Sequence, residues 1–116
     1  MISIGSDHGG YDLKMAIIAH LQKRGMECKD FGCYDKNSCD YPEFGRVAAE
    51  AVASGECEKG IVVCTTGIGI SIAANKVKGV ICALCTSTEL AKMSRLHNNA
   101  NMLALGASAV SEILAM

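Results

Sequence analysis

The sequence predicts an α/β domain of three layers, α/β/α, in which a five-stranded parallel sheet lies between two layers of helices. Short apolar runs alternate with longer segments whose apolar residues recur at helical spacing. The apolar runs are rich in β-branched residues and lack period-two alternation, as expected of strands buried on both faces. The connections are short, which favours repeated β-α units in one parallel sheet.

Length and composition bound the kind of protein. A chain of 116 residues, half of them apolar, is long enough for a single domain over 1–116 with an aliphatic core. A net charge of −1 gives no support for a nucleic-acid partner. No apolar run approaches the roughly 18 residues of a membrane span and no signal peptide is visible. The seven cysteines, an odd number, argue against a disulfide framework, so we expect a cytoplasmic protein without membrane contact.

The first part of the chain predicts two strands with a helix between them. Residues 2–5 form a short apolar strand. Residues 13–21 place leucines and isoleucines at helical spacing, and Gly25 is suited to end that helix. A second strand is expected over 27–31, followed by a polar loop over 32–41.

The middle of the chain predicts two helices around a central strand. Residues 43–54 carry their apolar side chains on one face and form the second helix. Residues 60–64 form a β-branched strand, and a third helix over 70–76 follows two glycines. Gly79 closes this helix, and the apolar run 80–85 forms the fourth strand.

The last part predicts two further helices and one strand. Residues 87–96 form the fourth helix, with Ser87 or Thr86 as its N-cap. Residues 102–105 form the fifth strand, and 108–116 resemble the start of a fifth helix. The last four residues are apolar, so we expect either a neighbouring subunit or further chain to cover them.

The polar motifs fall where the predicted strands end. These motifs are Ser6-Asp7-His8, Asp40-Tyr41, Cys64–Gly69, Thr86-Ser87 and the segment around His97. In parallel α/β sheets, ligands lie beyond the carboxyl ends of the strands. We therefore expect one candidate site at this edge of the sheet.

The stretch that begins at Cys64 is the most informative of these motifs. A strand that ends in a thiol and a hydroxyl, followed by a glycine turn that opens a helix, gathers several chemical groups at one point. Amides at the helix start can hold an anion, Thr66 can donate a hydrogen bond, and Cys64 can act as base or nucleophile if its pKa is lowered. Gly67 and Gly69 do not complete a dinucleotide fingerprint, because Ile72 stands where the third glycine would fall. We expect no nicotinamide cofactor.

Three motifs have structural as well as functional interpretations. Asp7 and His8 in a glycine-rich turn could bind sugar hydroxyls, or Asp7 could cap a helix. His97 is a lone histidine after a helix, for which a surface or capping role is the alternative to a catalytic one. Cys82 and Cys85 have the spacing of a metal or redox pair, but they lie in an apolar run with no second Cys or His pair nearby. We expect both to be small buried side chains.

Four separated motifs together carry a family resemblance. They are Ser6-Asp7-His8-Gly9-Gly10, Asp40-Tyr41-Pro42, Gly67-Ile68-Gly69-Ile70-Ser71-Ile72-Ala73-Ala74-Asn75-Lys76 and His97-Asn98-Asn99-Ala100-Asn101. In this order, and over nearly all of the chain, they resemble the ribose-5-phosphate isomerase B family, which also includes isomerases of the galactose-6-phosphate type. The resemblance implies a flavodoxin-like or Rossmann-like domain, a homodimer or tetramer, and interconversion of aldose and ketose phosphates without a metal or cofactor.

The resemblance also implies roles for individual residues. It assigns catalysis to Cys64, Thr66 and His97, and substrate binding to Asp7, His8, Tyr41, Gly67, Ile68, Gly69 and Asn98. Cys64 would be the base that moves a proton between C1 and C2 through a cis-enediolate, since the glutamate that other members use six residues later is Ile70 here. Thr66 and the following amides would hold the enediolate oxygens, and His97 would open the furanose ring.

The sequence departs from the family at three positions. Thr65 stands where a glycine is common, and Ser108 and Ile81 stand where arginines bind the substrate phosphate. Each lost arginine removes charge-assisted hydrogen bonds worth roughly 1.5–3 kcal/mol. A ribose 5-phosphate isomerase is therefore the first hypothesis, and an isomerase of another sugar, such as a six-carbon sugar phosphate, or a catalytically impaired paralogue are the alternatives.

Overall fold

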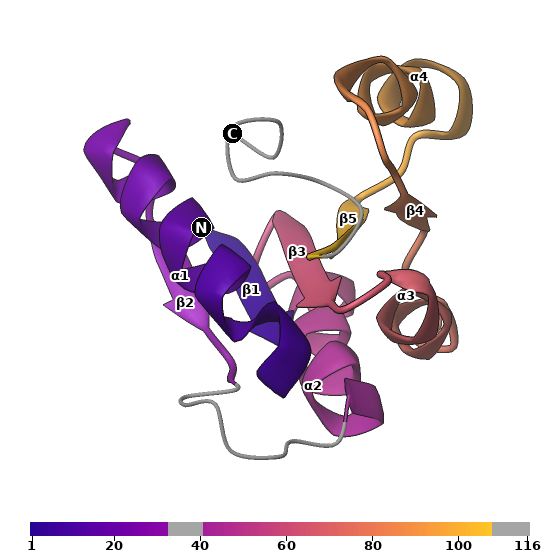
Figure 1. Cartoon of the computed structure of the whole chain (residues 1–116). Helices are drawn as coiled ribbons and strands as arrows, with labels where there is room; N and C mark the ends of the chain where they lie inside the picture. Colours follow the sequence, from indigo (N-terminus) through magenta and orange to yellow (C-terminus); the bar gives the residue numbers. More distant parts are fainter. Residues whose placement is uncertain (33–40, 108–116) are drawn as a thin grey trace.

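Five parallel strands form the sheet at the centre of the molecule (Figure 1). The computed structural model describes residues 1–32 and 41–107. The strands are β1 (Ile2–Ser6), β2 (Cys28–Asp30), β3 (Lys59–Cys64), β4 (Cys82–Leu84) and β5 (Met102–Gly106). The predicted five-stranded parallel sheet is confirmed, whereas the loop residues 33–40 and the helix expected over 108–116 lie outside the described residues.

The strand order is β2-β1-β3-β5-β4, so β4 is an edge strand and β5 lies beside β3. This order exchanges the last two strands of the flavodoxin-like arrangement. The chain leaves β1 toward β2 on one side and leaves β3 toward β4 on the other. A crevice between β1 and β3 at their carboxyl ends is therefore the place where a sheet of this kind binds ligands.

Helices cover both faces of the sheet. They are η1 (His8–Gly10), α1 (Tyr11–Lys23), α2 (Tyr41–Ala53), α3 (Ile68–Asn75) and α4 (Thr88–Asn98). Right-handed crossovers place α1 and α4 on one face and α2 and α3 on the other, because the two pairs connect strands in opposite directions across the sheet. No helix in this described part is long and apolar enough to span a membrane.

Two aliphatic clusters hold the layers together. Under α1, Leu13 and Ile17 pack against Ile4, Val63 and Leu105 of the sheet. The second cluster lies on the opposite face, under α2 and α3, and contains Ala48, Val52, Val62, Ile70, Ala74 and Ala104 among others. Small residues along α2 let this helix lie close to the sheet, and Ser3 Oγ donates to the carbonyl of Ala48 at 3.0 Å.

Some element boundaries differ from those the sequence predicts. Tyr41 begins α2 instead of ending a loop. The third helix begins at Ile68, directly after Gly67. The fourth strand has only three residues, because Ile81 N–H donates to the side chain of Asn101 instead of to a strand. The Ser87 cap of α4 is confirmed, since its hydroxyl accepts from Leu90 N–H at 3.1 Å.

Candidate active site

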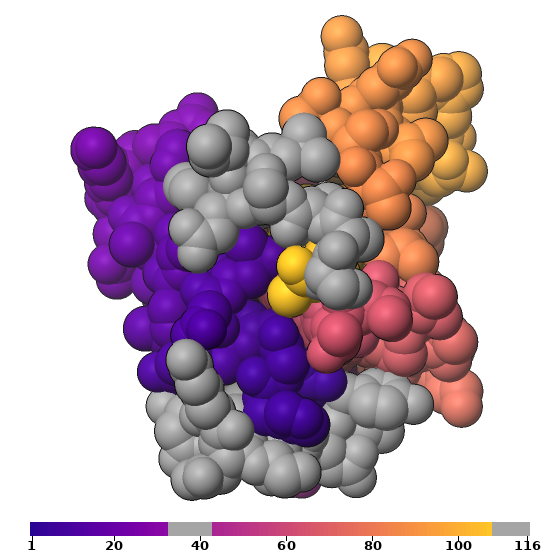
Figure 2. Space-filling view, in the orientation of Figure 1, coloured from indigo at the N-terminus to yellow at the C-terminus, as the bar shows by residue number. Residues whose placement is uncertain are grey.

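The candidate site lies where the loops after β1 and β3 meet. These strands are hydrogen-bonded neighbours in register, with Ser6 opposite Val63 at their carboxyl ends. Asp7 N–H donates to the carbonyl of Val63 at 3.2 Å and ties the two loops together at their base. In Figure 2 the indigo N-terminal segment borders the rose-coloured residues around α3.

Cys64 closes β3 and is buried, with 5% of its surface exposed. The backbone N–H of Gly67 lies 3.0 Å from its sulfur and donates to it. Gly67 has a φ of +82°, and a Cβ there would lie 2.5 Å from Leu84 Cδ1 and 2.9 Å from Gly106 N. Only glycine therefore fits this turn, which aims an N–H donor at the sulfur.

Thr66 lies on the outer side of this turn. Its side chain is exposed, and its hydroxyl accepts from Ile68 N–H at 3.2 Å. The backbone of Thr66 packs tightly on β5, since a Cβ on Gly106 would lie 2.3 Å from Thr66 O. The first amides of α3 follow directly, and helix starts leave such amides open to an anionic oxygen. A buried thiol, a hydroxyl and helix-start amides thus occupy one loop.

The loop after β1 brings a carboxylate and an imidazole to the same edge. Asp7 is buried, and its Oδ1 accepts from Gly10 N–H at 3.0 Å, so the capping interpretation of Asp7 is confirmed. His8 follows and is exposed. The first turn of α2 also lies near the carboxyl end of β1, as the short distance of 3.0 Å between a Cβ placed on Gly5 and the carbonyl oxygen of Phe44 shows. Tyr41, three residues earlier, therefore starts α2 at this edge of the sheet.

His97 and Asn98 lie at the other end of the sheet. They stand in the last turn of α4 and are exposed. Nearby Ser94 and Arg95 line a cavity of about 210 Å³ together with residues from the first positions of the strands: Ile2, Lys59, Gly60, Ile61, Met102 and Leu103 among them. Cys64 ends the six-residue strand β3, which spans about 17 Å at 3.3 Å per residue. Within one chain, the structure does not bring His97 and Asn98 to Cys64.

The arginines also lie away from the two loops. Arg46 pairs with Glu50 at 2.7 Å on the exposed face of α2. Arg95 donates to the carbonyl of Ala100 beside the start of β5, and Arg24 caps the far end of α1. None of the three arginines in the chain stands in the loop after β1 or after β3. Ile81 is exposed ahead of β4, and Ser108 lies outside the described residues.

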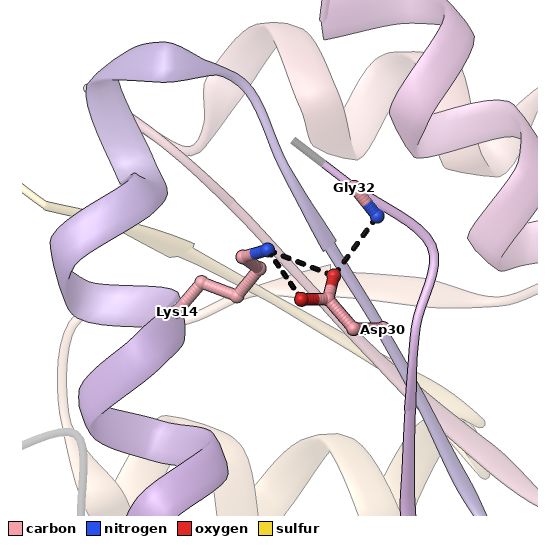
Figure 3. Close-up of polar contacts among 3 residues, drawn as sticks. All are labelled: Lys14, Asp30 and Gly32. Carbon is pink, nitrogen blue, oxygen red and sulfur yellow. Dashed lines mark hydrogen bonds and ion pairs between the residues drawn. The ribbon is translucent and has the colours of Figure 1, made fainter. Parts of the chain in front are cut away.

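A buried ion pair beside the site was not predicted. Lys14 of α1 is fully buried, and its Nζ lies 2.7 and 2.8 Å from the two carboxylate oxygens of Asp30 (Figure 3). Asp30 Oδ1 also accepts from Gly32 N–H at 2.9 Å, and the carbonyl of Gly32 accepts from Ser6 N–H at 2.6 Å. This chain of contacts joins α1 to the carboxyl ends of β2 and β1. It ends at Ser6, the residue before Asp7.

The signal for that pair was present in the sequence. Lys14 lies three residues before Ile17 and four before Ile18, so helical spacing places it on the apolar face of α1. A lysine on such a face requires a partner of opposite charge.

Cys82 and Cys85 agree with the structural interpretation given to them. Cys82 and Cys85 are buried and free, and burial raises the pKa of Cys82 to about 12, with the nearby Cys85 thiol adding to the rise. Burial also raises the pKa of Cys57, Cys28 and Cys85. Over residues 1–32 and 41–107, no group of three His, Cys, Asp or Glu side chains is placed to hold a metal ion.

Comparison with known proteins places this fold and site in a family. Residues 2–116 match the Ribose/Galactose Isomerase family. This chain belongs to that family. Ribose/galactose isomerases are aldose–ketose isomerases. The resemblance to the ribose-5-phosphate isomerase B family, predicted from the four sequence motifs, is confirmed.

Several relatives of this ribose/galactose isomerase are similar over most of its length. Ribose-5-phosphate isomerase B of Escherichia coli is 46% identical over 114 residues, which cover 98% of this chain and 76% of the relative. Galactose-6-phosphate isomerase subunit LacB of Clostridium acetobutylicum is 46% identical over 106 residues, covering 91% of this chain and 61% of the relative. The solved structure of Clostridium thermocellum ribose-5-phosphate isomerase B is 60% identical with a TM-score of 0.97, covering 98% of this chain and 77% of that one.

Proposed function

We propose that this isomerase interconverts ribose 5-phosphate and ribulose 5-phosphate, with Cys64 as the base. The observation that supports this most directly is the Gly67 N–H aimed at the buried Cys64 sulfur at 3.0 Å. It places a hydrogen-bond donor on the sulfur in the loop that also carries exposed Thr66 and the start of α3. The similarity to ribose-5-phosphate isomerase B proteins supports the choice of substrate.

The proton transfer follows from these groups. The Cys64 thiolate takes the proton from C2 of the open-chain aldose, and the electron pair of that C–H bond forms the C1–C2 double bond. The carbonyl electrons move to O1, which gives a cis-enediolate. Thr66 and the amide of Gly69 stabilise the negative oxygens, since the amides of Gly67 and Ile68 already donate to Cys64 Sγ and Thr66 Oγ1. The hydroxyl proton on O2 passes to O1, the Cys64 thiol returns its proton to C1, and the C2 oxygen becomes the ketone of the product.

Substrate binding uses the loop after β1 and the start of α2. Asp7 and His8 stand beside the Cys64 loop, and Tyr41 begins α2 at the same edge. We assign sugar hydroxyls to these side chains. The proposed reaction uses no metal or cofactor, as the family resemblance implies. We also place the enzyme in the cytoplasm, which suits its free cysteines.

A catalytic role for His97 requires a second copy of the chain. His97 stands at the amino ends of the strands and Cys64 at the carboxyl ends, so one chain cannot bring them together. A homodimer in which α4 of one copy reaches the site of the other would supply His97 for ring opening and Asn98 for binding. The surface of α4 suits such docking, because α4 buries no residue in its own chain and Leu90, Met93 and Leu96 are exposed by 50%, 41% and 69%.

The assay that tests the function is formation of ribulose 5-phosphate from ribose 5-phosphate by the purified chain. Cys64→Ala is expected to lower kcat by at least about 10³-fold, because no other base stands in the loop. Cys57→Ala is the matched control, since Cys57 is a buried cysteine in the core of the same sheet; it should lower stability and leave kcat unchanged. Equal activity of the unmutated chain and Cys64→Ala would refute Cys64 as the base.

Galactose 6-phosphate is the second substrate to test. The two loops contain no arginine to select the position of the substrate phosphate, and one relative is a galactose-6-phosphate isomerase subunit. Turnover of the six-carbon substrate alone would replace the proposed substrate and keep the chemistry. Activity on neither substrate would favour the impaired paralogue.

Mixing two inactive variants tests the origin of His97. If the site is shared between copies, a Cys64→Ala chain paired with a His97→Ala chain has one site with both defects and one intact site. Random pairing then restores about one quarter of the unmutated activity. If each site is built from one chain, every site in the mixture carries a defect and no activity returns.

A further inference from the structure

The two loops of the candidate site meet at a second point, between Gly9 and Thr65. A Cβ on Gly9 would lie 2.1 Å from Thr65 Oγ1 and 3.4 Å from the oxygen Oδ1 of Asp7. Non-bonded atoms do not approach to 2.1 Å, so a side chain at position 9 must displace either Thr65 or the loop itself. The Thr65 side chain therefore fills the space between the loops, and it fits there only because residue 9 has no side chain.

Backbone conformation does not explain the glycine at position 9. In the described residues the glycines with positive φ are 25, 32, 55, 67 and 79, and the one such non-glycine residue is Asn99. Gly9 and Thr65 both adopt conformations open to ordinary residues. The contact with Thr65 is thus a steric reason for glycine at position 9, and Thr65 stands in its loop without backbone strain.

The backbone of the loop after β3 is held in place next to this contact. The Thr66 backbone packs closely against Gly106, and Gly67 packs closely against Leu84 and Gly106. Cys64 is also held by the Gly67 N–H. In the loop after β1, His8 and Gly9 are exposed, whereas Gly10 is buried against Val63. A side chain at position 9 would therefore displace Thr65 Oγ1 or the exposed tip of the loop after β1 and leave Cys64 in place.

We propose that Thr65 is a positioning residue that, through its contact with Gly9, sets the distance between the Asp7–His8 loop and the Cys64–Thr66 loop. This inference rests on the proposed function, in which the first loop binds the sugar and the second moves the proton. Thr65 acts through the loop and not on the reacting carbons. Its contribution is to substrate binding more than to the chemical step.

Gly9→Ala is the decisive variant. It is expected to raise KM for ribose 5-phosphate about tenfold or more and to change kcat by less than about threefold, because displacement of the binding groups by about 1 Å weakens binding while Cys64 stays in place. Thr65→Ala removes Oγ1 and leaves the Cβ of residue 65 at 3.4 Å from a Cβ at position 9, an ordinary contact. The double variant Gly9→Ala/Thr65→Ala should therefore recover the KM of Thr65→Ala alone.

Thr65→Val is the matched control, because valine keeps the branched shape of threonine and replaces the hydroxyl by a methyl group. Gly9→Ala should remain as harmful in the Thr65→Val chain as in the unmutated chain. A KM for Gly9→Ala equal to that of the unmutated chain would overturn the proposal, as would a Gly9→Ala defect that Thr65→Ala does not relieve.

Thermal unfolding separates this proposal from the proposed function. If the unmutated chain shows no isomerase activity, the proposed function fails, and the contact is then judged by the midpoint temperatures of the four chains alone. Gly9→Ala should lower the midpoint, and Thr65→Ala should restore it. Midpoints that shift additively, or two variants that both fail to fold, would refute the contact.

Discussion

The Lys14–Asp30 pair allows an asymmetric effect of charge removal to be predicted. Asp30→Asn removes the negative charge with little change of shape and leaves Lys14 charged and fully buried. Lys14→Met removes the positive charge and leaves Asp30, whose side chain is 27% exposed and still accepts from Gly32 N–H. The two variants break the same contact but leave behind groups in different surroundings.

The exposures set the expected magnitudes. Breaking a buried pair so that a charge stays buried costs about 3–5 kcal/mol of the free energy of unfolding. This range applies to Asp30→Asn, since water does not reach Lys14. A carboxylate that keeps one N–H donor and partial contact with water costs less, about 1–3 kcal/mol, and this range applies to Lys14→Met. The double variant should cost less than the sum of the two, because it removes both charges.

Urea unfolding of the four chains at neutral pH measures these differences. Domains of this size unfold with about 5–15 kcal/mol, so Asp30→Asn should visibly lower the midpoint concentration. Lys14→Met at least as destabilising as Asp30→Asn, or losses that add within about 0.5 kcal/mol in the double variant, would refute the reasoning.

Three further predictions concern stability. Asn75→Ala should cost about 2–3 kcal/mol in thermal unfolding, since the amide binds Cys82 N at 2.7 Å and Cys82 O at 2.9 Å; a loss below about 0.5 kcal/mol would contradict this. Ser3→Ala should lower the free energy of unfolding by about 1 kcal/mol, because the hydrogen bond to the Ala48 carbonyl is lost. Ser6→Ala should leave the free energy of unfolding unchanged or raise it, because Ser6 Oγ is buried without a partner in the described structure. A larger loss for Ser6→Ala than for Ser3→Ala in urea unfolding would contradict both expectations. Above pH 9 the unfolded chain loses the Cys82 proton, whereas the native chain keeps it up to about pH 12. The free energy of unfolding should therefore fall by up to about 1.4 kcal/mol per pH unit in this window. The fall should be smaller in Cys82→Val, and an equal fall in that variant would exclude Cys82 as the cause.

The sequence predicted the elements because their local signals agree with their surroundings. Val62 and Val63 lie in a β-branched run that is buried on both faces in β3. Ser87 caps α4 by the hydrogen bond that its side chain suggests. Cys64, Thr66 and Asp7 were placed at one edge because the carboxyl ends of parallel strands must meet there.

The rest depends on contacts between residues far apart in the chain. The strand β4 begins only at Cys82, because the side chain of Asn101, twenty residues further along the chain, accepts from Ile81 N–H. The order of β4 and β5 is not encoded in either strand, since both are short and apolar. His97 was expected near the site from its motif, although a helix that returns to the start of the next strand carries its last turn to the opposite edge. Lys14 was missed because charged residues are usually exposed.

Asn75 has a consequence for how this protein meets other copies of itself. In β4 the N–H and C=O of Cys82 point away from β5, toward the open edge of the sheet, and the Asn75 amide binds both. The amide thus occupies the place of a neighbouring strand. Exposed edges of this kind recruit strands from other molecules and lead to aggregation. With Asn75 in place, Cys82 offers no free backbone group for extending the sheet, which directs contacts between copies toward side-chain surfaces such as α4.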